Sequence, residues 1–414
     1  MLRQSASTVD RGASGRNIVR FVVMLVAVAV PALAMLLTFV GLVQDDVGGV
    51  QGLDGVVSLA VSPDGNDLYA VGSGDNALAV FDRNPSDGTL AFREVHVDGV
   101  AGVQGLNTPM AVAVSPDGVH VMVASILDDS LAVFRRNPAT GSLDFVNVYQ
   151  DGVGGIFGLD GANDVAVSSD GSLVFVTGEV DDTVAVFSRD PGLDDLVLAD
   201  VEQNGVAGVQ NMNRPTSVGV SPDNHHIYVT ADLDQSVVVF TRDATQDEIA
   251  FTADVETPVS PSSVTLDWTG EHAYVAGGDW LRVYIRNPGT GLIVPTALYI
   301  DGVDGVDGLA GANAVVVTPV GRAAFASGSV DNAVAEFSRN SSSGLLDYLD
   351  VIRDGVGGVN GLDNARGIAV SPDSRFLYVA GMDDDAIAIF EIGPPIFTDG
   401  FESGDTSAWS ATVP

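Results

Sequence analysis

The fold is decided by the nine residues Asp98-Gly99-Val100-Ala101-Gly102-Val103-Gln104-Gly105-Leu106, because versions of them recur along the chain. The motif begins again at Asp151, Asn204, Asp301 and Asp354, and in degraded form at Asp45. Its usual spacing is 53 residues. A repeat of about this length is typical of propellers and solenoids, in which each repeat is one small unit that must pack on its neighbours.

Each unit continues with a short apolar strand and a turn. The turns are Ser62-Pro63-Asp64-Gly65, Ser115-Pro116-Asp117-Gly118, Ser168-Ser169-Asp170-Gly171, Ser221-Pro222-Asp223-Asn224 and Ser371-Pro372-Asp373-Ser374, with weaker versions at Asp267-Trp268-Thr269-Gly270 and Thr318-Pro319-Val320-Gly321. A second strand, an acidic turn, a third strand, an Arg-Asn-Pro-type turn and a fourth strand follow. Seven units of four short strands predict an all-β, seven-bladed β-propeller with four-stranded blades.

The strand count also predicts how the ring closes. The seventh unit ends after its third strand, near Phe390, so only six fourth strands follow the first strands. Residues 37–44 lie one period before the fourth strand of the first unit. We therefore expect this N-terminal strand to complete the last blade, which removes an exposed sheet edge.

The N-terminus allows two interpretations. Arg3, Arg11, Arg16 and Arg20 precede an apolar stretch, and Pro31-Ala32-Leu33-Ala34 resembles a signal-peptidase site. These features predict a signal peptide at 1–34, a propeller at 35–392 and a tail at 393–414, with the mature protein secreted, periplasmic or on a bacterial cell surface. The alternative is a membrane anchor formed by residues 18–43, a stretch long enough to span a bilayer.

Charge and composition restrict the chemistry. The formal net charge is −37, with 46 Asp, nine Glu, no Lys and no Cys. Such a charge repels phosphate backbones and anionic lipids, so we expect no nucleic-acid partner and no stable membrane insertion after signal cleavage. Schiff-base and thiol chemistry are excluded in this chain. A small-molecule or protein partner stays open, and we expect a monomer.

The repeats resemble one known family. The Val-Ser-Pro-Asp-Gly turns, the Leu377-Tyr378-Val379-Ala380 ending and the Val133–Leu143 segment resemble the lactonase-like seven-bladed propellers, which include 6-phosphogluconolactonase and YVTN-repeat proteins. Enzymes of that family often carry Gly-Pro-Arg-His where an inner strand begins. Asn364-Ala365-Arg366-Gly367 keeps the arginine without the proline or the histidine. The resemblance implies the fold and, as an alternative function, sugar-lactone hydrolysis.

Positions that differ between the units predict the binding site. Arg366 stands in a slot that Val57, Met110, Asn163, Thr216, Ser262 and Asn313 occupy elsewhere. An arginine can clamp a carboxylate or phosphate with two parallel hydrogen bonds. We therefore expect a candidate anion site in the central channel, formed by Arg366, Asn163, Asn313, Arg214, Thr216 and Ser262.

The loops predict an acidic face. Asp residues gather in the motif loops and in the turns between second and third strands, where turn chemistry alone favours them. Asp301, Asp304 and Asp307 form a weak Ca²⁺ candidate, since they lack the full ligand set of an EF-hand loop. No other cofactor is expected.

Three functions remain compatible with these observations. The first is an exported binding or scaffold propeller with an acidic loop face and no recognisable catalytic constellation. The second is a sugar-lactone hydrolase, and the third is a cell-surface adhesion or surface-layer module. A carboxylate or histidine in the channel, within reach of a substrate, would distinguish the enzyme from the others.

Overall fold

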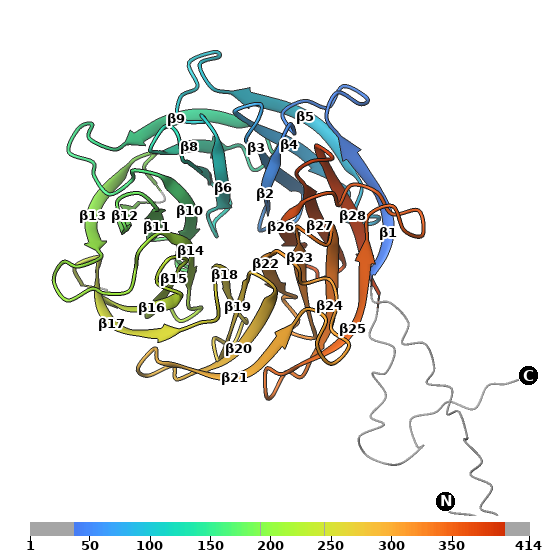
Figure 1. The fold of residues 1–414 in the computed structure, drawn as a ribbon. Helices are drawn as coiled ribbons and strands as arrows, with labels where there is room; N and C mark the ends of the chain where they lie inside the picture. Colours follow the sequence, from blue (N-terminus) through green and yellow to red (C-terminus); the bar gives the residue numbers. More distant parts are fainter. Residues whose placement is uncertain (1–36, 191, 244, 394–414) are drawn as a thin grey trace, which may run out of the picture. The chain divides into compact units, whose positions relative to one another are not determined.

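The computed structural model describes residues 37–190, 192–243 and 245–393. These residues form seven antiparallel sheets of four strands each, arranged around a central axis (Figure 1). The predicted seven-bladed propeller is confirmed. The predicted signal peptide and most of the predicted tail lie outside the described residues, and their roles stay predictions. The described residues contain no helix that is long and apolar enough to cross a membrane.

The blades are numbered in chain order. Blade 1 is formed by β2 (Val56–Val61), β3 (Asp67–Gly72), β4 (Ala77–Arg83) and β5 (Leu90–Val97). Blade 2 is formed by β6 (Pro109–Val114), β7 (His120–Ser125), β8 (Ser130–Arg136) and β9 (Leu143–Gln150). Blade 3 is formed by β10 (Ala162–Val167), β11 (Leu173–Gly178), β12 (Thr183–Arg189) and β13 (Leu196–Gln203). Blade 4 is formed by β14 (Pro215–Val220), β15 (His226–Ala231), β16 (Ser236–Asp243) and β17 (Glu248–Glu256).

The remaining blades repeat the arrangement. Blade 5 is formed by β18 (Pro261–Leu266), β19 (His272–Gly277), β20 (Trp280–Arg286) and β21 (Ile293–Ile300). Blade 6 is formed by β22 (Ala312–Val317), β23 (Ala323–Gly328), β24 (Ala333–Arg339) and β25 (Leu346–Arg353). Blade 7 is formed by β26 (Ala365–Val370), β27 (Phe376–Gly381), β28 (Ala386–Ile392) and, from the start of the chain, β1 (Leu37–Gln44).

The ring is closed by β1. This strand pairs antiparallel with β28, from Leu37 opposite Ile392 to Gln44 opposite Ala386, with an irregularity between Phe39 and Gly41. In Figure 1 the blue β1 lies beside the red β28. The expectation that residues 37–44 complete the last blade is therefore confirmed, and β28 has no exposed edge.

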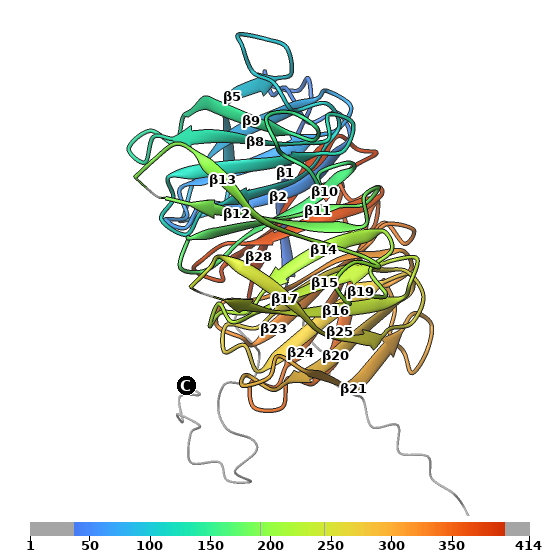
Figure 2. The same ribbon diagram turned by 90° about the vertical axis from the view of Figure 1, so that its left-hand side faces the viewer.

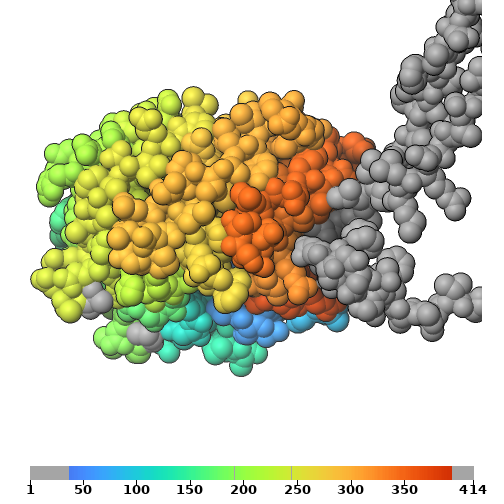
Figure 3. All heavy atoms as spheres, turned by 90° about the horizontal axis from the view of Figure 1, so that it is seen from below, coloured from blue at the N-terminus to red at the C-terminus, as the bar shows by residue number. Residues whose placement is uncertain are grey.

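The core lies between the blades. All six residues of every second strand are buried, because each blade packs on both of its neighbours. Phe residues of the third strands and Tyr residues of the second strands fill these contacts, as Phe134 and Tyr69 do in blades 2 and 1. Figures 2 and 3 show the ring from its side, with successive blades stacked against one another. Burial on both faces explains the apolar runs of the repeat.

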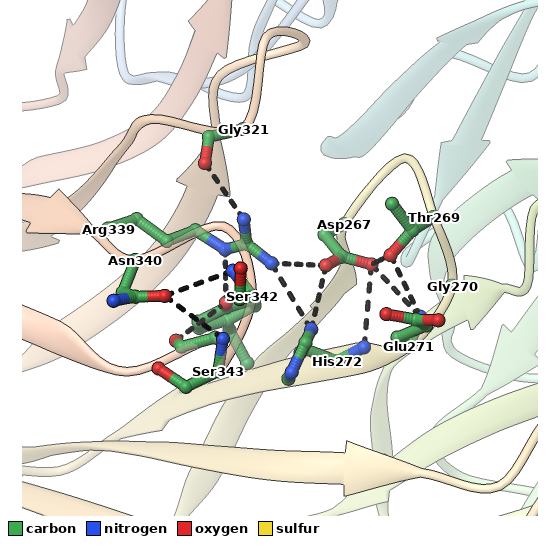
Figure 4. Close-up of polar contacts among 12 residues, drawn as sticks. Asp267, Thr269, Gly270, Glu271, His272, Gly321, Arg339, Asn340, Ser342 and Ser343 are labelled. Carbon is green, nitrogen blue, oxygen red and sulfur yellow. Dashed lines mark hydrogen bonds and ion pairs between the residues drawn. The ribbon is translucent and has the colours of Figure 1, made fainter. Parts of the chain in front are cut away.

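A polar contact joins the turns of neighbouring blades. Six blades carry an arginine at or next to the end of the third strand, and its side chain reaches an aspartate in the first turn of the preceding blade. The pairs are Arg83–Asp373, Arg136–Asp64, Arg189–Asp117, Arg242–Asp170, Arg286–Asp223 and Arg339–Asp267. We call this contact the turn staple. Figure 4 shows one staple, in which Arg339 also donates to the Gly321 carbonyl.

Three of the five histidines belong to the staples. His120, His226 and His272 begin the second strands of their blades, and each places Nδ1 within 3.2 Å of the arginine of the following blade. Burial lowers the pKa of His120 and of His226, so the neutral ring is the form beside the guanidinium. These histidines are structural partners of arginine and do not gather into a metal site.

The boundary between blades 6 and 7 differs from the others. Blade 7 has Ile392 where the other blades have the arginine, and the turn of blade 6 has Val320 where the other turns have an acidic or hydrogen-bonding residue. Both halves of the staple are thus replaced together. Because both halves are missing at the same boundary, we infer that the arginine and the aspartate contribute as a pair.

Candidate functional site

The central axis holds a cavity of about 600 Å³. It is lined by the beginnings of the inner strands, by the loops that precede them and by the turns that follow the second strands. All six residues predicted for the anion site line it, namely Arg366, Asn163, Asn313, Arg214, Thr216 and Ser262. A cavity of this size suits a small molecule such as a sugar acid.

Three of these six side chains connect neighbouring blades. The Thr216 hydroxyl donates to the Pro261 carbonyl at 2.9 Å, and the Ser262 hydroxyl donates to the Ala312 carbonyl at 2.9 Å. Asn163 reaches the Thr216 carbonyl from Nδ2 at 3.4 Å. Each therefore links its inner strand to the next one, so a structural role accounts for much of what these polar groups do.

Arg366 is in a different situation. Its Nε donates to Asn364 Oδ1 at 3.0 Å, and no carboxylate of the described residues lies within ion-pair distance of its guanidinium. Asn313 likewise makes no side-chain hydrogen bond with any residue in the described ranges. A guanidinium keeps its charge in proteins and must find acceptors or water. The two terminal nitrogens of Arg366 are thus available to a molecule in the cavity.

Arg214 also lines the cavity but is already paired. Its Nη1 lies 3.2 Å from Asp232 Oδ2, and its Nε lies 3.8 Å from Glu179 Oε1. Burial and the charge of Asp232 raise the pKa of Glu179, while Arg214 opposes that change. This trio presents one arginine between two carboxylates, so it is less suited to an anion than Arg366 is.

Asp164 is a cavity residue that the sequence analysis did not identify. It is half-buried on β10, where other blades have Ser58, Ser217 or Ser263. Like those serines it accepts a backbone N–H of the next blade, from Val218 to Oδ2 at 2.8 Å, while Oδ1 accepts the Val165 N–H at 2.8 Å. Burial raises its pKa to about 6, and the hydrogen bonds only partly offset that cost. The group is therefore a carboxylate near neutral pH with remaining acceptor capacity.

Charged groups lie on two sides of the cavity. Arg366 is on β26 of blade 7, next to Asn313 of blade 6, whereas Asp164, Glu179, Arg214 and Asp232 belong to blades 3 and 4. Figure 1 shows β26 and the pair β10 and β14 on opposite sides of the axis. A molecule held by its anionic end at Arg366 would direct its other end toward the carboxylates.

The aspartates of the loop face are largely turn residues. The first residue of the motif loop accepts the backbone N–H eight residues later, as Asp98 does from Leu106 and Asp151 does from Leu159. The turns between second and third strands do the same with the loop that leads into their own blade, as Asp128 does from Asn107. Turn chemistry therefore accounts for the recurrence of these residues.

The Ca²⁺ candidate is arranged differently from the prediction. Asp301 and Asp307 come together with Asp331, with oxygen atoms within 4.8 Å of one another, whereas Asp304 is exposed at the loop tip. Arg353 binds both oxygens of Asp307 and lies 3.7 Å from Asp331. Because this guanidinium already supplies the positive charge, the cluster fits an arginine better than a Ca²⁺ ion.

Both the sequence and the fold are similar to those of known proteins. Residues 43–156 and 158–309 match the family described as lactonase, seven-bladed β-propeller. No curated protein matches the sequence. The fold is similar to a candidate 6-phosphogluconolactonase from Bacteroides uniformis, at 19% identity and a TM-score of 0.59, covering 72% of this chain and 85% of that one.

Two further solved structures share the fold. A candidate 6-phosphogluconolactonase from Bacteroides fragilis has 16% identity and a TM-score of 0.59, covering 72% of this chain and 84% of that one. Hydrazine synthase from Kuenenia stuttgartiensis has 16% identity and a TM-score of 0.62, and the match covers 84% of this chain and 97% of that one. Proteins described with different activities thus share this fold, and likeness at such low identity indicates the fold alone. With the family match extending over more than half of the sequence, the chain belongs to the lactonase family of seven-bladed β-propellers.

Proposed function

We propose that this propeller binds a small anionic molecule, of the size of a sugar acid, in its central cavity. One observation carries the proposal: Arg366 lines the cavity with no carboxylate partner among the described residues, in a chain of net charge −37. Asn313, the adjacent cavity residue of blade 6, has a free amide that can donate to the same anion.

The test replaces Arg366 by the residue that another blade uses. Met110 stands in the equivalent slot of blade 2, so Arg366→Met is a substitution that the fold already accommodates. Binding of gluconate, glucarate and 6-phosphogluconate is measured by calorimetry. We expect binding to weaken about 10- to 100-fold, as for the loss of a charged hydrogen-bond pair, and the melting temperature to stay nearly unchanged.

The matched control is Arg322→Met. Arg322 is exposed in the turn between β22 and β23, on the opposite face of the ring, so this variant changes the net charge equally without touching the cavity. Equal weakening in both variants would mean that the ligand responds only to total charge. Absence of binding by the unmodified protein to all three anions would contradict the proposal.

A second candidate function is hydrolysis of a sugar lactone. Asp164 favours it, because a carboxylate with a pKa of about 6 in the cavity can act as a general base toward water. In such a reaction Asp164 takes a proton from water as the water oxygen adds to the lactone carbonyl. The acyl C–O bond of the ring then breaks, and Asp164 returns the proton to the ring oxygen, which leaves as a hydroxyl. Arg366 would hold the anionic substituent of the substrate.

The enzyme is tested with Asp164→Ser. Serine occupies this slot in blades 1, 4 and 5, so the contact between inner strands is kept while the base is lost. We expect kcat for lactone hydrolysis to fall at least about 100-fold, with binding of 6-phosphogluconate retained. A panel of lactones that the unmodified protein leaves intact would remove this candidate and leave the binding function.

We also propose that the mature protein is exported. The arginines before residue 21, the apolar stretch and Pro31-Ala32-Leu33-Ala34 support a cleaved signal peptide. Participation of residues 37–44 in blade 7 also supports cleavage before that strand, since the same residues cannot form a lipid-embedded helix. N-terminal sequencing of exported protein should begin near Met35. An intact N-terminus held in the membrane fraction would favour the anchor.

A further inference from the structure

Aliphatic side chains are exposed at one repeated position of the loop face. Leu127, Val180 and Leu233 occupy equivalent positions in the turns between second and third strands of blades 2, 3 and 4, with 65%, 62% and 64% of their surface exposed. Blade 6 has Val330 there, with 75% of its surface exposed, whereas blades 1 and 7 have Gly74 and Asp383, and the shorter turn of blade 5 lacks the position. The turn therefore does not need an aliphatic residue, and blades 2, 3 and 4 are the consecutive blades that carry one.

The third residue of the motif loop is an exposed valine in six blades, at Val47, Val100, Val153, Val206, Val303 and Val356. The loops that lead into blades 3 and 5 add Phe157 and Val259, so the exposed apolar side chains beside blades 3, 4 and 5 are Val153, Phe157, Val206 and Val259. Because loops from fourth to first strands and turns from second to third strands share one face of each blade, these side chains and the three above belong to one sector. We call the seven residues the apolar arc. Exposed apolar groups gathered in this way mark interaction surfaces.

Negative charge accompanies the apolar arc. Asp128, Asp181 and Asp234 directly follow Leu127, Val180 and Leu233, and each is held by a backbone N–H of the adjacent loop. Burial and repulsion from neighbouring aspartates raise the pKa of Asp160 and of Asp181. The one arginine of this part of the cavity rim, Arg214, is already paired with Glu179 and Asp232. The carboxylates around the arc thus keep a charge that a partner can neutralise.

We propose that the apolar arc docks a segment of a partner protein in which lysine or arginine residues alternate with aliphatic ones. The aliphatic side chains would cover Leu127, Val180 and Leu233, and the cationic groups would pair with the aspartates beside them. A second copy of this chain would bring another net charge of −37, and anionic lipid surfaces would be repelled as well. Charge complementarity therefore selects a basic protein segment among the possible occupants.

The absence of lysine from the sequence makes the site accessible to a direct test. A peptide of alternating Lys and Leu residues is mixed with the full chain, and a carbodiimide then joins amines to carboxylates as amides, with water lost to the reagent. Since the protein has no lysine and the peptide is used with an amidated C-terminus, amides formed by a lysine amine can only join the peptide to the protein. We expect peptide cross-links at Asp128, Asp181 and Asp234. Cross-links spread evenly over all blades would contradict the proposal.

A pair of matched variants tests the aliphatic part. The triple variant Leu127→Ser, Val180→Ser, Leu233→Ser removes exposed side chains of the arc and keeps every charge. The control Leu292→Ser, Val320→Ser, Leu345→Ser removes three exposed apolar side chains from turns on the opposite face. We expect the first variant to bind the peptide about tenfold more weakly, a loss of about 1.4 kcal/mol, and the control to bind as the unmodified protein does.

The other occupants are outcomes of the same experiment. A peptide of alternating Lys and Ser should bind at least about tenfold more weakly than the Lys-Leu peptide; equal binding would mean that charge alone is recognised. Light scattering that shows a dimer, lost only in the arc variant, would assign the arc to a second copy. Binding to phosphatidylserine vesicles, or no binding of the Lys-Leu peptide, would likewise overturn the proposal.

Discussion

Arg286 of blade 5 donates from Nη2 to both carboxylate oxygens of Asp223 in blade 4, at 2.9 and 2.8 Å. Its Nε also donates to Tyr228 Oη at 2.7 Å, and its side chain is fully enclosed. Despite the cost of burial, hydrogen bonds from Ser221 and Arg286 lower the pKa of Asp223 to about 2. The pair is therefore ionised at neutral pH and joins two blades that share no sheet and are connected covalently only by the loop between β17 and β18.

Removing one partner of this staple should be costly. Asp223→Ala leaves the buried Arg286 charge without its carboxylate, so we expect the free energy of unfolding to fall by about 2 to 3 kcal/mol. Urea denaturation measures the change. The control is Val320→Ala, at the equivalent turn position facing blade 7, which should change stability by less than about 0.5 kcal/mol. Equal effects would mean that the staple contributes little.

The unstapled boundary offers the reverse experiment. Val320→Asp together with Ile392→Arg introduces both halves of the staple between blades 6 and 7. We expect the double variant to be more stable than the sum of the single variants predicts, with a coupling of about 1 to 2 kcal/mol in a double-mutant cycle. Strict additivity would show that the matched replacement has another cause.

Because β1 closes the ring, we expect a large difference in stability between two truncated chains. A chain beginning at Leu37 keeps β1 and should unfold like a chain beginning at Met35. A chain beginning at Gln44 loses buried Leu37 and the contact of Phe39 with Phe390, whose ring centroids lie 5.5 Å apart. We expect stability to fall by more than about 4 kcal/mol and the bare edge of β28 to promote aggregation. Equal melting temperatures would refute the closure argument.

The pH dependence of Asp164 follows from its raised pKa. The folded protein holds this proton up to about pH 6, whereas the unfolded chain releases it near the ordinary value of 3.8. Between these values the folded state binds more protons, so the contribution of Asp164 to stability falls as the pH rises through this window. Asp164→Ser should therefore gain in melting temperature over the unmodified protein as the pH is raised from 4 to 7. A difference that does not change with pH would contradict this assignment.

Much of the architecture could be predicted because the same pattern of strands and turns occurs seven times in the sequence. The strand pattern, the ring closure by residues 37–44 and the slot of Arg366 all follow from counting equivalent positions. The sequence analysis missed Asp164 because this residue lies one position after that slot, where other blades have small residues. A comparison of the next position in each repeat would have shown one acid among serines, alanines and a glycine.

The turn staple could not be read from one repeat. The arginine appears in sequence as part of an Arg-Asn-Pro turn, and its aspartate belongs to a different turn of another unit, 63 residues earlier for Arg286 and Asp223. Only the order of blades around the axis brings them together. The pairing of Glu179 with Arg214 could not be predicted for a related reason, since Arg214 comes from the loop that leads into the following blade.

The register of β1 on β28 also determines how the ring responds to a pulling force. Leu37 and Ile392 form the first pair of this ladder, so both chain ends of the ring leave from the same end of one strand pair. A load applied between them would open the pairs one after another, as a zipper opens, and would not shear all of them at once. The pairing of β1 with β28 is therefore mechanically weak. Stretching the protein in an optical trap should detach β1 at low force before any blade unfolds.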